Sequence, residues 1–516
     1  FSFGNPEVNE NYPYIFNLVT DPFDNFTYNA RRLRTFQFVD NFTWVRGDHT
    51  FKSGLNFRFG RQIDDRSSVS GADITPRVFF GTGSNWGTAF ITQFAIPASG
   101  STSINSSDRT RLLQLINDQL GRLGNVSQAF VADPADPTQF AAAGTRWGFT
   151  HYYPEYDFYF QDSWKAKTNL TLDLGLRWEV KLSPSSDGLP TLRPDGQVSF
   201  GGTPSNTLRW TEGKLFQNDY DNFSPSIGAA WDPLKDGKTS IRANFRVAYD
   251  RLPSQVFANS IFQSAPGNNT GVVNTAFSQA GALLRNGLPT LTPSSTPDVL
   301  RTPLALSSNS ITLLDSDFQY PEVYSWFVGF QREVLDGSVL EINYIGKRGV
   351  HLFGGYDANQ VNLNATDPRC PGQTVLSAFR EAQDTTTTAN CLMTLLNGTN
   401  GTPSSLAAFR STFSSQLNLN AVASVAQTFA QRSGTTSLTA NGFSPFFLMR
   451  YPQFTGGMNV LDSNDVSMYN ALEVILRRRL KSGISLQLSY TLAKSMDTRS
   501  FDPTFTTVSR GSNHSA

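Results

Sequence analysis

Long apolar segments are missing from this chain of 516 residues. No run of about 18 apolar residues occurs, so a membrane-spanning helix is excluded. A β-barrel does not need such a run, because only alternate residues of its strands face lipid. The missing segments therefore exclude one kind of membrane protein and leave the other open.

An excess of charge of either sign is also missing. Charged residues make up 16% of the chain, and 42 Lys and Arg balance 42 Asp and Glu. Without a net charge, no long-range field attracts nucleic acid or an anionic surface. We therefore expect no nucleic-acid partner.

Residues that carry catalytic or metal chemistry are few. The chain has two cysteines and four histidines, and the histidines lie far apart, at positions 49, 151, 351 and 514. No HExxH, CxxC or Walker motif is present, and no second cysteine pair or nearby histidine completes a zinc site. We therefore predict that the protein is not an enzyme and has no catalytic, cofactor-binding or metal-ligating residues.

The chain is instead rich in segments in which apolar and polar residues alternate. Every even-numbered residue from 170 to 180 is Leu, Trp or Val, whereas Thr171, Asp173, Arg177 and Glu179 occupy odd positions. In a strand these two sets fall on opposite faces. Such a strand separates an apolar environment from a polar one.

Five pairs of such segments are joined by short turns. They cover residues 36–61, 156–180, 223–250, 323–347 and 467–494, with turns at 46–49, 165–169, 233–238, 335–338 and 480–483. The intervals between pairs are much longer, and strand, short turn, strand and long loop is the order typical of an outer-membrane β-barrel. We predict an all-β fold: about ten strands of a larger antiparallel up-and-down transmembrane β-barrel, with long extracellular loops carrying short helices. Two loop segments, 108–124 and 404–431, have the apolar spacing of helices and are expected to form small outer lids.

Charged residues are concentrated on the polar faces of these strands, where they would meet water in the barrel lumen. The candidate lumen-lining residues are Lys52, Arg58, Arg177, Glu179, Arg242, Arg246, Glu341, Lys347, Glu473, Arg477 and Arg479. Most of them are expected to be solvated wall residues that contact no ligand. Asp40 and Asp162 are different, because each lies on an otherwise apolar face, and a carboxylate there is expected near the periplasmic interface.

Cys370 and Cys391 lie in one long predicted loop. In an exported protein we expect them to form a disulfide, which would contribute about 3 kcal/mol for a loop of this size. Two free thiols are the alternative.

The two ends of the sequence lack features that a complete barrel protein needs. Residues 1–6 contain no basic and apolar regions of an export signal, and residues 509–516 resemble an interrupted loop rather than a closing strand. We therefore interpret the chain as an internal fragment.

Several strand segments resemble the Oar-like branch of TonB-dependent outer-membrane receptors, in the order expected for that family. They include DNFTWVRGDHTFKSG at 40–54 and SYTLAKS at 489–495, and also residues 159–164, 170–179, 249–250, 329–332, 340–352 and 469–472. All five hairpins take part in the resemblance, while the loops match little.

The resemblance implies a barrel of about 22 strands plugged by an N-terminal domain, preceded in this branch by a small carboxypeptidase-regulatory-like β-sandwich. Residues 1–516 would then be a partial receptor barrel domain without the plug, the N-terminal domains and the C-terminal strands. Expected partners are TonB, through a missing N-terminal segment, outer-membrane lipid and an unknown solute. The implied function is active uptake across the bacterial outer membrane of a bulky solute such as a glycan, peptide or metal chelate. A passive porin and a surface β adhesin remain alternatives.

Overall fold

The computed structural model describes most of the chain. The described residues are 14–15, 29–66, 68–69, 72–74, 76–80, 105–133, 135–136, 138–187, 192–194, 210–251, 253–254, 256, 269–274, 282–288, 290–293, 310–335, 337–481 and 483–499.

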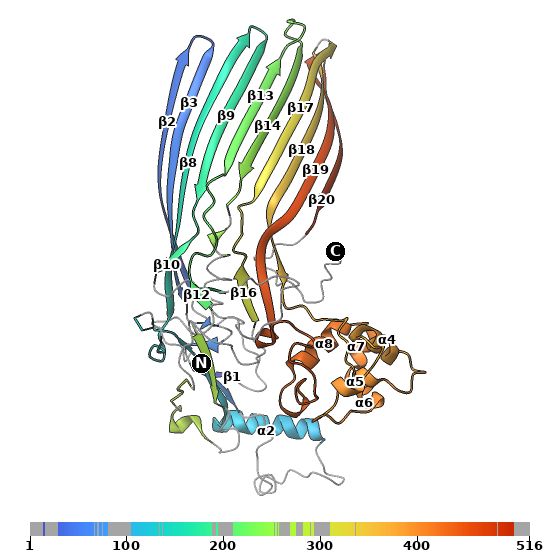
Figure 1. The fold of residues 1–516 in the computed structure, drawn as a ribbon. Coiled ribbons are helices and arrows are strands. Elements are labelled where there is room, and N and C mark those ends of the chain that lie inside the picture. The colour runs from blue at the N-terminus through green and yellow to red at the C-terminus, as the bar shows by residue number, and fades with distance from the viewer. Residues whose placement is uncertain are drawn as a thin grey trace.

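One large sheet dominates the described residues (Figure 1). Its long strands are β2 (Asn29–Arg46), β3 (His49–Arg66), β8 (Trp147–Lys167), β9 (Leu170–Lys181), β13 (Phe223–Trp231), β14 (Thr239–Tyr249), β17 (Glu322–Leu335), β18 (Ser338–Asp357), β19 (Gly457–Lys481) and β20 (Ile484–Asp497). Each pairs antiparallel with its neighbour in this order. The five predicted hairpins and the antiparallel fold class are therefore confirmed. Several strands extend beyond the predicted limits at the ends joined by long loops.

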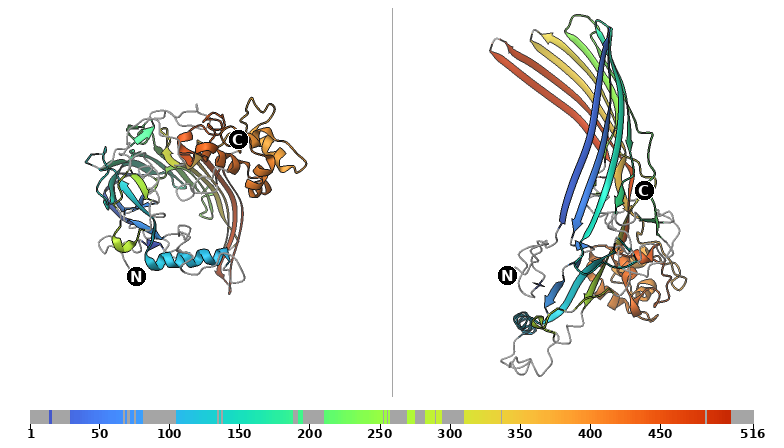
Figure 2. Two further views of the ribbon diagram at one scale, coloured as in Figure 1. Left: turned by 90° about the horizontal axis from the view of Figure 1, so that it is seen from below. Right: turned by 90° about the vertical axis from the view of Figure 1, so that its left-hand side faces the viewer.

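The sheet curves into an open arc (Figure 2). In the described residues, β2 and β20 form its two edges and do not pair with each other. Residues that are opposite partners in neighbouring strands share a face of the sheet, so the register sorts side chains into rows. The convex face is the one seen in Figure 1.

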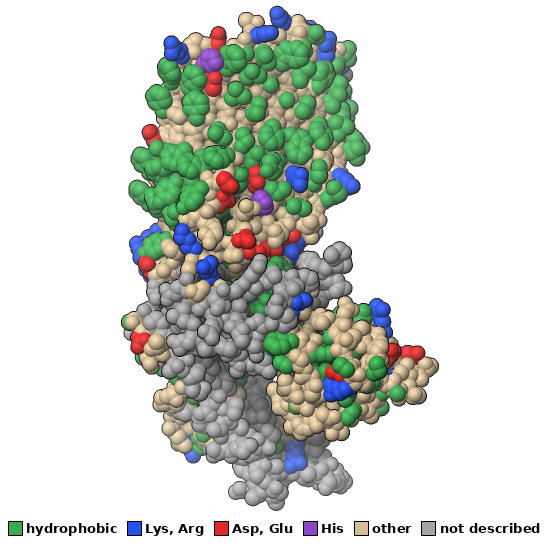
Figure 3. Space-filling view, viewed as in Figure 1, with side chains coloured by type: hydrophobic (Ala, Val, Ile, Leu, Met, Phe, Trp, Pro, Cys, Tyr) green, Lys and Arg blue, Asp and Glu red, His purple; other side chains and the backbone are tan. Residues whose placement is uncertain are grey.

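Apolar side chains cover the convex face along most of the strand length (Figure 3). Phe42, Leu176, Ile227, Val328 and Leu492 are at least half exposed there. Residues of the other parity, which include the charged positions predicted for the lumen, lie on the concave face. This distribution is the reverse of that in a soluble sheet, where the exposed face is polar.

A layer of smaller elements lies at the end of the sheet where the long loops emerge. A second sheet contains β1 (Tyr14–Ile15), β6 (Arg77–Phe80), β7 (Leu123–Val131) and β15 (Asn269–Asn274). The remaining short elements are β4 (Ser68–Val69), β5 (Ala72–Asp73), β10 (Ser185–Asp187), β11 (Leu192–Pro194), β12 (Trp210–Glu212), η2 (Leu284–Asn286) and β16 (Ser310–Leu314). Of these, β16 pairs parallel with the first residues of β19.

The predicted helix at 108–124 corresponds to α2 (Ser106–Leu120), and its predicted C-terminal end is too late. Gly121 has a φ of 63°, the left-handed conformation that ends many helices, and its N–H donates to the carbonyls of Asn117 and Asp118. Leu123, which was included in the predicted helix, begins β7 and is buried.

Residues 358–456, between β18 and β19, contain a compact group of helices that we call the helical insert. Its helices are α4 (Val375–Gln383), α5 (Cys391–Leu396), α6 (Leu406–Thr412), α7 (Ser414–Asn418) and α8 (Val422–Gln431), with η3 (Gly434–Thr436) and η4 (Pro452–Phe454) after them. They enclose a core of their own that includes Phe379, Met393, Phe409 and Phe429. The helical pattern predicted at 404–431 is confirmed, and it forms three short helices, α6, α7 and α8. In the described residues, no helix is long and apolar enough to cross a membrane.

Candidate functional site

The concave face brings several of the predicted lumen residues into rows. Lys52, Arg246 and Lys347 belong to one row, which crosses the sheet through Gln161, Gly175, Ser226 and Ser325. A shallow cavity of about 550 Å³ lies around Arg246 and Lys347. Phe327 and Ile345 add apolar surface to its lining. This part of the wall therefore combines two cations and the carboxylate of Asp173 with small and apolar side chains.

The remaining positions toward the short turns form a second group. Arg242 and Glu473 share a row through Gly329 and Asn343. Arg477 pairs with Glu341 at 3.4 Å across neighbouring strands. Arg479 lies at the last turn, where its backbone N–H donates to the carbonyl of Gly337. These charges are spread along the wall and do not converge on one point.

Arg177 and Glu179 lie in an ion network at the long-loop end of the wall, in which Arg177 is exposed and the other members are buried. Arg177 contacts Asp157 at 2.7 Å and Glu179 at 3.5 Å, and Lys181 contacts Glu179 at 2.6 Å. Glu179 and Lys181 are 8% and 5% exposed, and the hydroxyl of Ser224 donates to Glu179. Buried charges are tolerated only when they are paired in this way. Asp157 and Lys181 were not predicted, although they continue the same alternation.

Two aromatic rings, from β14 and from a loop, lie near the ammonium group of Lys181. Its ammonium group lies 5.8 Å from the ring centre of Tyr249 and 5.7 Å from that of Tyr320. Burial raises the pKa of the Tyr320 hydroxyl, which therefore stays neutral. Asp219, whose backbone forms a bridge with Lys181, also has a raised pKa, of about 6, because it is partly buried and close to Asp221. The long-loop end of the wall is therefore lined by aromatic side chains, which give it a low local dielectric constant.

Arg58 lies in a second cavity, of about 370 Å³, beside this network. Glu155 contacts both Arg58, at 3.7 Å, and Arg251, at 3.3 Å. Tyr153 closes one side, where its hydroxyl donates to the carbonyl of Ser254 at 3.2 Å. Glu155, Arg251 and Tyr153 were not predicted. Glu155 and Tyr153 lie just before the predicted hairpin at 156–180, at odd-numbered positions like the polar residues of its first strand. No local signal places Arg251, which comes from a loop.

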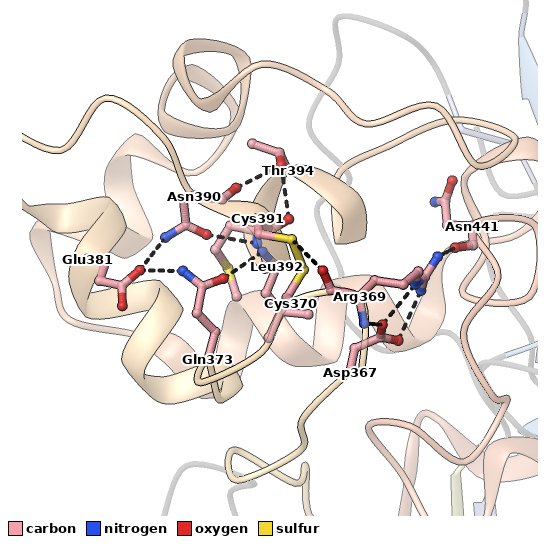
Figure 4. The surroundings of a disulfide bond; sticks show 11 residues. Asp367, Arg369, Cys370, Gln373, Glu381, Asn390, Cys391, Leu392, Thr394 and Asn441 are labelled. Carbon is pink, nitrogen blue, oxygen red and sulfur yellow. Dashed lines mark hydrogen bonds and ion pairs between the residues drawn. A yellow bond between two sulfur atoms is a disulfide. The ribbon is translucent and has the colours of Figure 1, made fainter.

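Cys370 and Cys391 form a disulfide in the helical insert, with 5.6 Å between their Cα atoms (Figure 4). It joins the segment before α4 to the first residue of α5. Gln373 lies next to it and accepts a hydrogen bond from the N–H of Leu392. The Arg369 guanidinium, bound to Asp367 at 2.8 Å, holds the pKa of that carboxyl below its usual range. These contacts connect the disulfide to the core of the insert.

Of the two acidic residues on the apolar face, Asp162 lies close to the turn at 165–169, whereas Asp40 lies farther from its turn, within β2. Asp162 contacts Nδ1 of His49 at 2.7 Å, and the His49 ring stacks on Phe51 and Trp164. Asp40 is opposite Leu55 and is exposed. Among the described residues, no three or more His, Cys, Asp or Glu side chains are grouped so that they could hold a metal ion.

A curved antiparallel sheet with an apolar convex face and a charged concave face is the architecture of an outer-membrane β-barrel wall. The chain belongs to the outer membrane beta barrel domain family, whose model matches residues 3–515. Its location is the bacterial outer membrane.

Individual proteins match only in part. A segment of 111 residues is 29% identical to the TonB-dependent transporter Oar of Myxococcus xanthus and covers 22% of this chain and 8% of Oar. Among solved structures, the outer-membrane transporter YddB of Escherichia coli matches 91% of this chain at 10% identity with a TM-score of 0.38. The ferripyoverdine receptor of Pseudomonas aeruginosa matches 92% at 9% identity with a TM-score of 0.31. The chain spans 34% of each of these two structures. These relatives are transporters and receptors, not enzymes.

Proposed function

We propose that this chain is part of the barrel wall of a TonB-dependent transporter that takes up a bulky solute across the outer membrane. The observation that carries this proposal is the separation of the two faces. An apolar convex face suits lipid, and a concave face with rows of Lys, Arg and Glu suits a water-filled path.

The long-loop end supplies features that a solute site requires. A cavity with apolar walls and a few fixed charges, such as that around Arg58, Glu155 and Arg251, is the usual form of a small-molecule site. Below it, Arg177 and Glu179 of β9 contact Asp157 of β8 and Ser224 of β13, so this network links three neighbouring strands. A glycan, a peptide or a metal chelate would all offer groups for these side chains, and we propose this range as the substrate class.

We further propose that residues 1–516 are one portion of the barrel domain. The edges of β2 and β20 would pair with further strands, because bilayer hydrocarbon does not tolerate unpaired backbone groups. The plug and the segment that contacts TonB would come from other parts of the complete protein.

The test is uptake by the native host with and without TonB. Solutes that co-purify with the complete protein are identified by mass spectrometry, and their uptake by cells is then measured. We expect uptake that stops when TonB is deleted and when the proton gradient is dissipated. Uptake that continues without TonB would indicate a passive porin, and surface binding without uptake would indicate an adhesin.

A further inference from the structure

The five short turns form one continuous edge of the wall. Backbone hydrogen bonds join each turn to the next: Lys165 N–H to Asp48 O at 2.8 Å, and Asp232 N–H to Asn169 O, Glu333 N–H to Lys238 O and Arg479 N–H to Gly337 O, each at 2.9 Å. We call residues 46–49, 165–169, 232–238, 332–338 and 478–483 the turn edge. In outer-membrane barrels the short turns are on the periplasmic side.

The turn edge is positively charged in a chain that is neutral. It contains nine Lys and Arg but five Asp and Glu, whereas the whole chain has 42 of each. The rest of the chain therefore has a slight excess of acidic residues. Blue Lys and Arg side chains are visible along the upper margin of Figure 3.

Three of the five carboxylates of the turn edge accept hydrogen bonds within their own turns. Asp232 accepts hydrogen bonds from the backbone N–H groups of Leu234, Lys235 and Gly237, at 2.9 to 3.2 Å. Asp236 accepts from the N–H of Lys238, and Glu333 accepts from that of Gly337. Their charges stabilise turn geometry and are poorly placed to neutralise a neighbouring cation.

Several of the cations, in contrast, lack charged partners. The side chains of Arg46, Lys165, Lys167 and Lys235 are exposed, and within the described part of the chain none of them forms an ion pair. Lys238 approaches Glu333 only at 4.0 Å and is 61% exposed. The turn edge therefore presents cations that no internal group compensates.

Exposed aromatic and aliphatic side chains adjoin these cations. Trp44 and Trp231 lie on the convex face close to the turns, 47% and 45% exposed, and the Arg46 guanidinium lies 5.7 Å from the ring centre of Trp44. Tryptophan prefers the headgroup level of a bilayer. This places the neighbouring cations at the depth of lipid phosphates.

We propose that the turn edge is a binding surface for the headgroups of negatively charged phospholipids in the periplasmic leaflet. Lys165, Lys167 and Lys235 supply the uncompensated charge, and the adjacent tryptophans contact the upper acyl chains. A lipid fits this surface better than a small anion does, because the cations are spread along an edge next to apolar side chains and do not converge on a pocket. The proposal requires the membrane orientation of the barrel and is independent of the transported solute.

The experiment is a lipid titration of the complete protein in detergent, followed by native mass spectrometry. Phosphatidylglycerol is compared with phosphatidylcholine of the same acyl chains. The test variant is K165Q/K167Q/K235Q. The control variant R111Q/K214Q/R380Q removes three exposed cations at the other end of the molecule.

We expect tighter binding of phosphatidylglycerol, and a loss of at least about tenfold in the test variant but not in the control, because each cation near an anionic lipid surface changes binding on the order of fivefold. Equal affinity for the two lipids, or equal losses in both variants, would overturn the proposal. If the test variant does not fold, the proposal is tested on the wild type instead. Its preference for phosphatidylglycerol over phosphatidylcholine is then measured at several salt concentrations. A preference that does not fall between about 0.05 M and about 1 M salt would contradict an electrostatic surface.

Discussion

Leu174 and Asp173 are sequence neighbours whose side chains lie on opposite faces of β9. Leu174 is 44% exposed on the convex face, and Asp173 lines the shallow concave cavity. An arginine on the lipid face of a barrel costs about 2 to 4 kcal/mol at the bilayer midplane and little in the lumen. We expect Leu174→Arg to reduce the folded fraction of the complete protein strongly and Asp173→Arg to leave it nearly unchanged. The measurement is the heat-modifiable band on gel electrophoresis, and equal damage from both changes would refute the assigned orientation.

Gly346 shows why a small residue is required at one point of the convex face. The indole of Trp326, its partner in β17, occupies the space that a Cβ on Gly346 would need. We expect Gly346→Ala to displace Trp326 and to destabilise the barrel by about 1 to 3 kcal/mol, as overpacking usually does. The change in the free energy of unfolding is measured by urea unfolding of the complete protein in lipid vesicles.

Gly60→Ala is the matched control for that variant. At Gly60 the nearest atom to an added Cβ is Tyr153 Cβ, at 3.4 Å, which is close to an ordinary contact. A loss of stability at Gly60 as large as that at Gly346 would show that general strand propensity, and not Trp326, is responsible.

At the residue level, the sequence predicted correctly which face of the sheet a strand residue lies on, because the two-residue period of a strand determines it. Alternation alone indicated that Arg177 and Glu179 share the polar face. It could not indicate that Arg251 meets Glu155, because these residues are 96 positions apart and one of them is in a loop. Contacts that depend on the path of a loop have no periodic signal in the sequence.

The helical insert is the element most dependent on a covalent bond. The Cys370–Cys391 disulfide closes a loop with a sequence separation of 21 residues. On chain entropy, a loop of this size gives about 3 kcal/mol. We expect the Cys370→Ser/Cys391→Ser double variant to lose about this much stability in the insert, measured by hydrogen exchange of α4 and α5. Thiol labelling of the denatured, unreduced wild type should find no free cysteine, and two labelled cysteines would exclude the bridge.

The loop that carries Asp219 should respond to pH. Its folded pKa, about 6, exceeds the usual value of about 3.9, so the folded loop binds a proton more tightly than the unfolded chain does. Stability is therefore greatest at low pH and declines as pH rises through the window from about 4 to about 6. We expect residues 213–223 to exchange hydrogen faster at pH 7 than at pH 5, after correction for the intrinsic rate.

Asp219→Asn removes the titrating group while keeping a similar shape. The difference between the two pH values should then disappear. If the difference persists in this variant, Asp219 is not the group that controls the loop.

Element limits were harder to predict in the loops than in the wall. Phe413 and Asn420 interrupt the helical pattern at 404–431, and Asn420 has a φ of 54°, which no helix interior allows. The apolar spacing of this segment nevertheless identified its buried side chains, since Leu406, Phe409 and Phe413 all lie in the core of the insert. A spacing pattern identifies the buried face, but short helices that pack on each other preserve it across breaks.

At the scale of the whole molecule, the sheet has two long free edges. In the described residues, β2 and β20 each pair with a strand on one side only. Hydrocarbon cannot satisfy the exposed N–H and C=O groups, and in water such edges pair with other chains. We therefore expect these 516 residues, expressed alone, to aggregate or to form mixed oligomers, whereas the complete protein should give one species.

The measurement is refolding of both chains into detergent micelles, followed by size-exclusion chromatography and gel electrophoresis with and without boiling. A closed barrel migrates differently before and after boiling, and the complete protein is the positive control. Closing this sheet on itself would require β2 to pair with β20, with a narrower lumen and a different shear from the observed arc. A monodisperse, heat-modifiable species from the 516 residues would show that such closure occurs. The proposal of a larger wall would then be replaced by that of a compact pore.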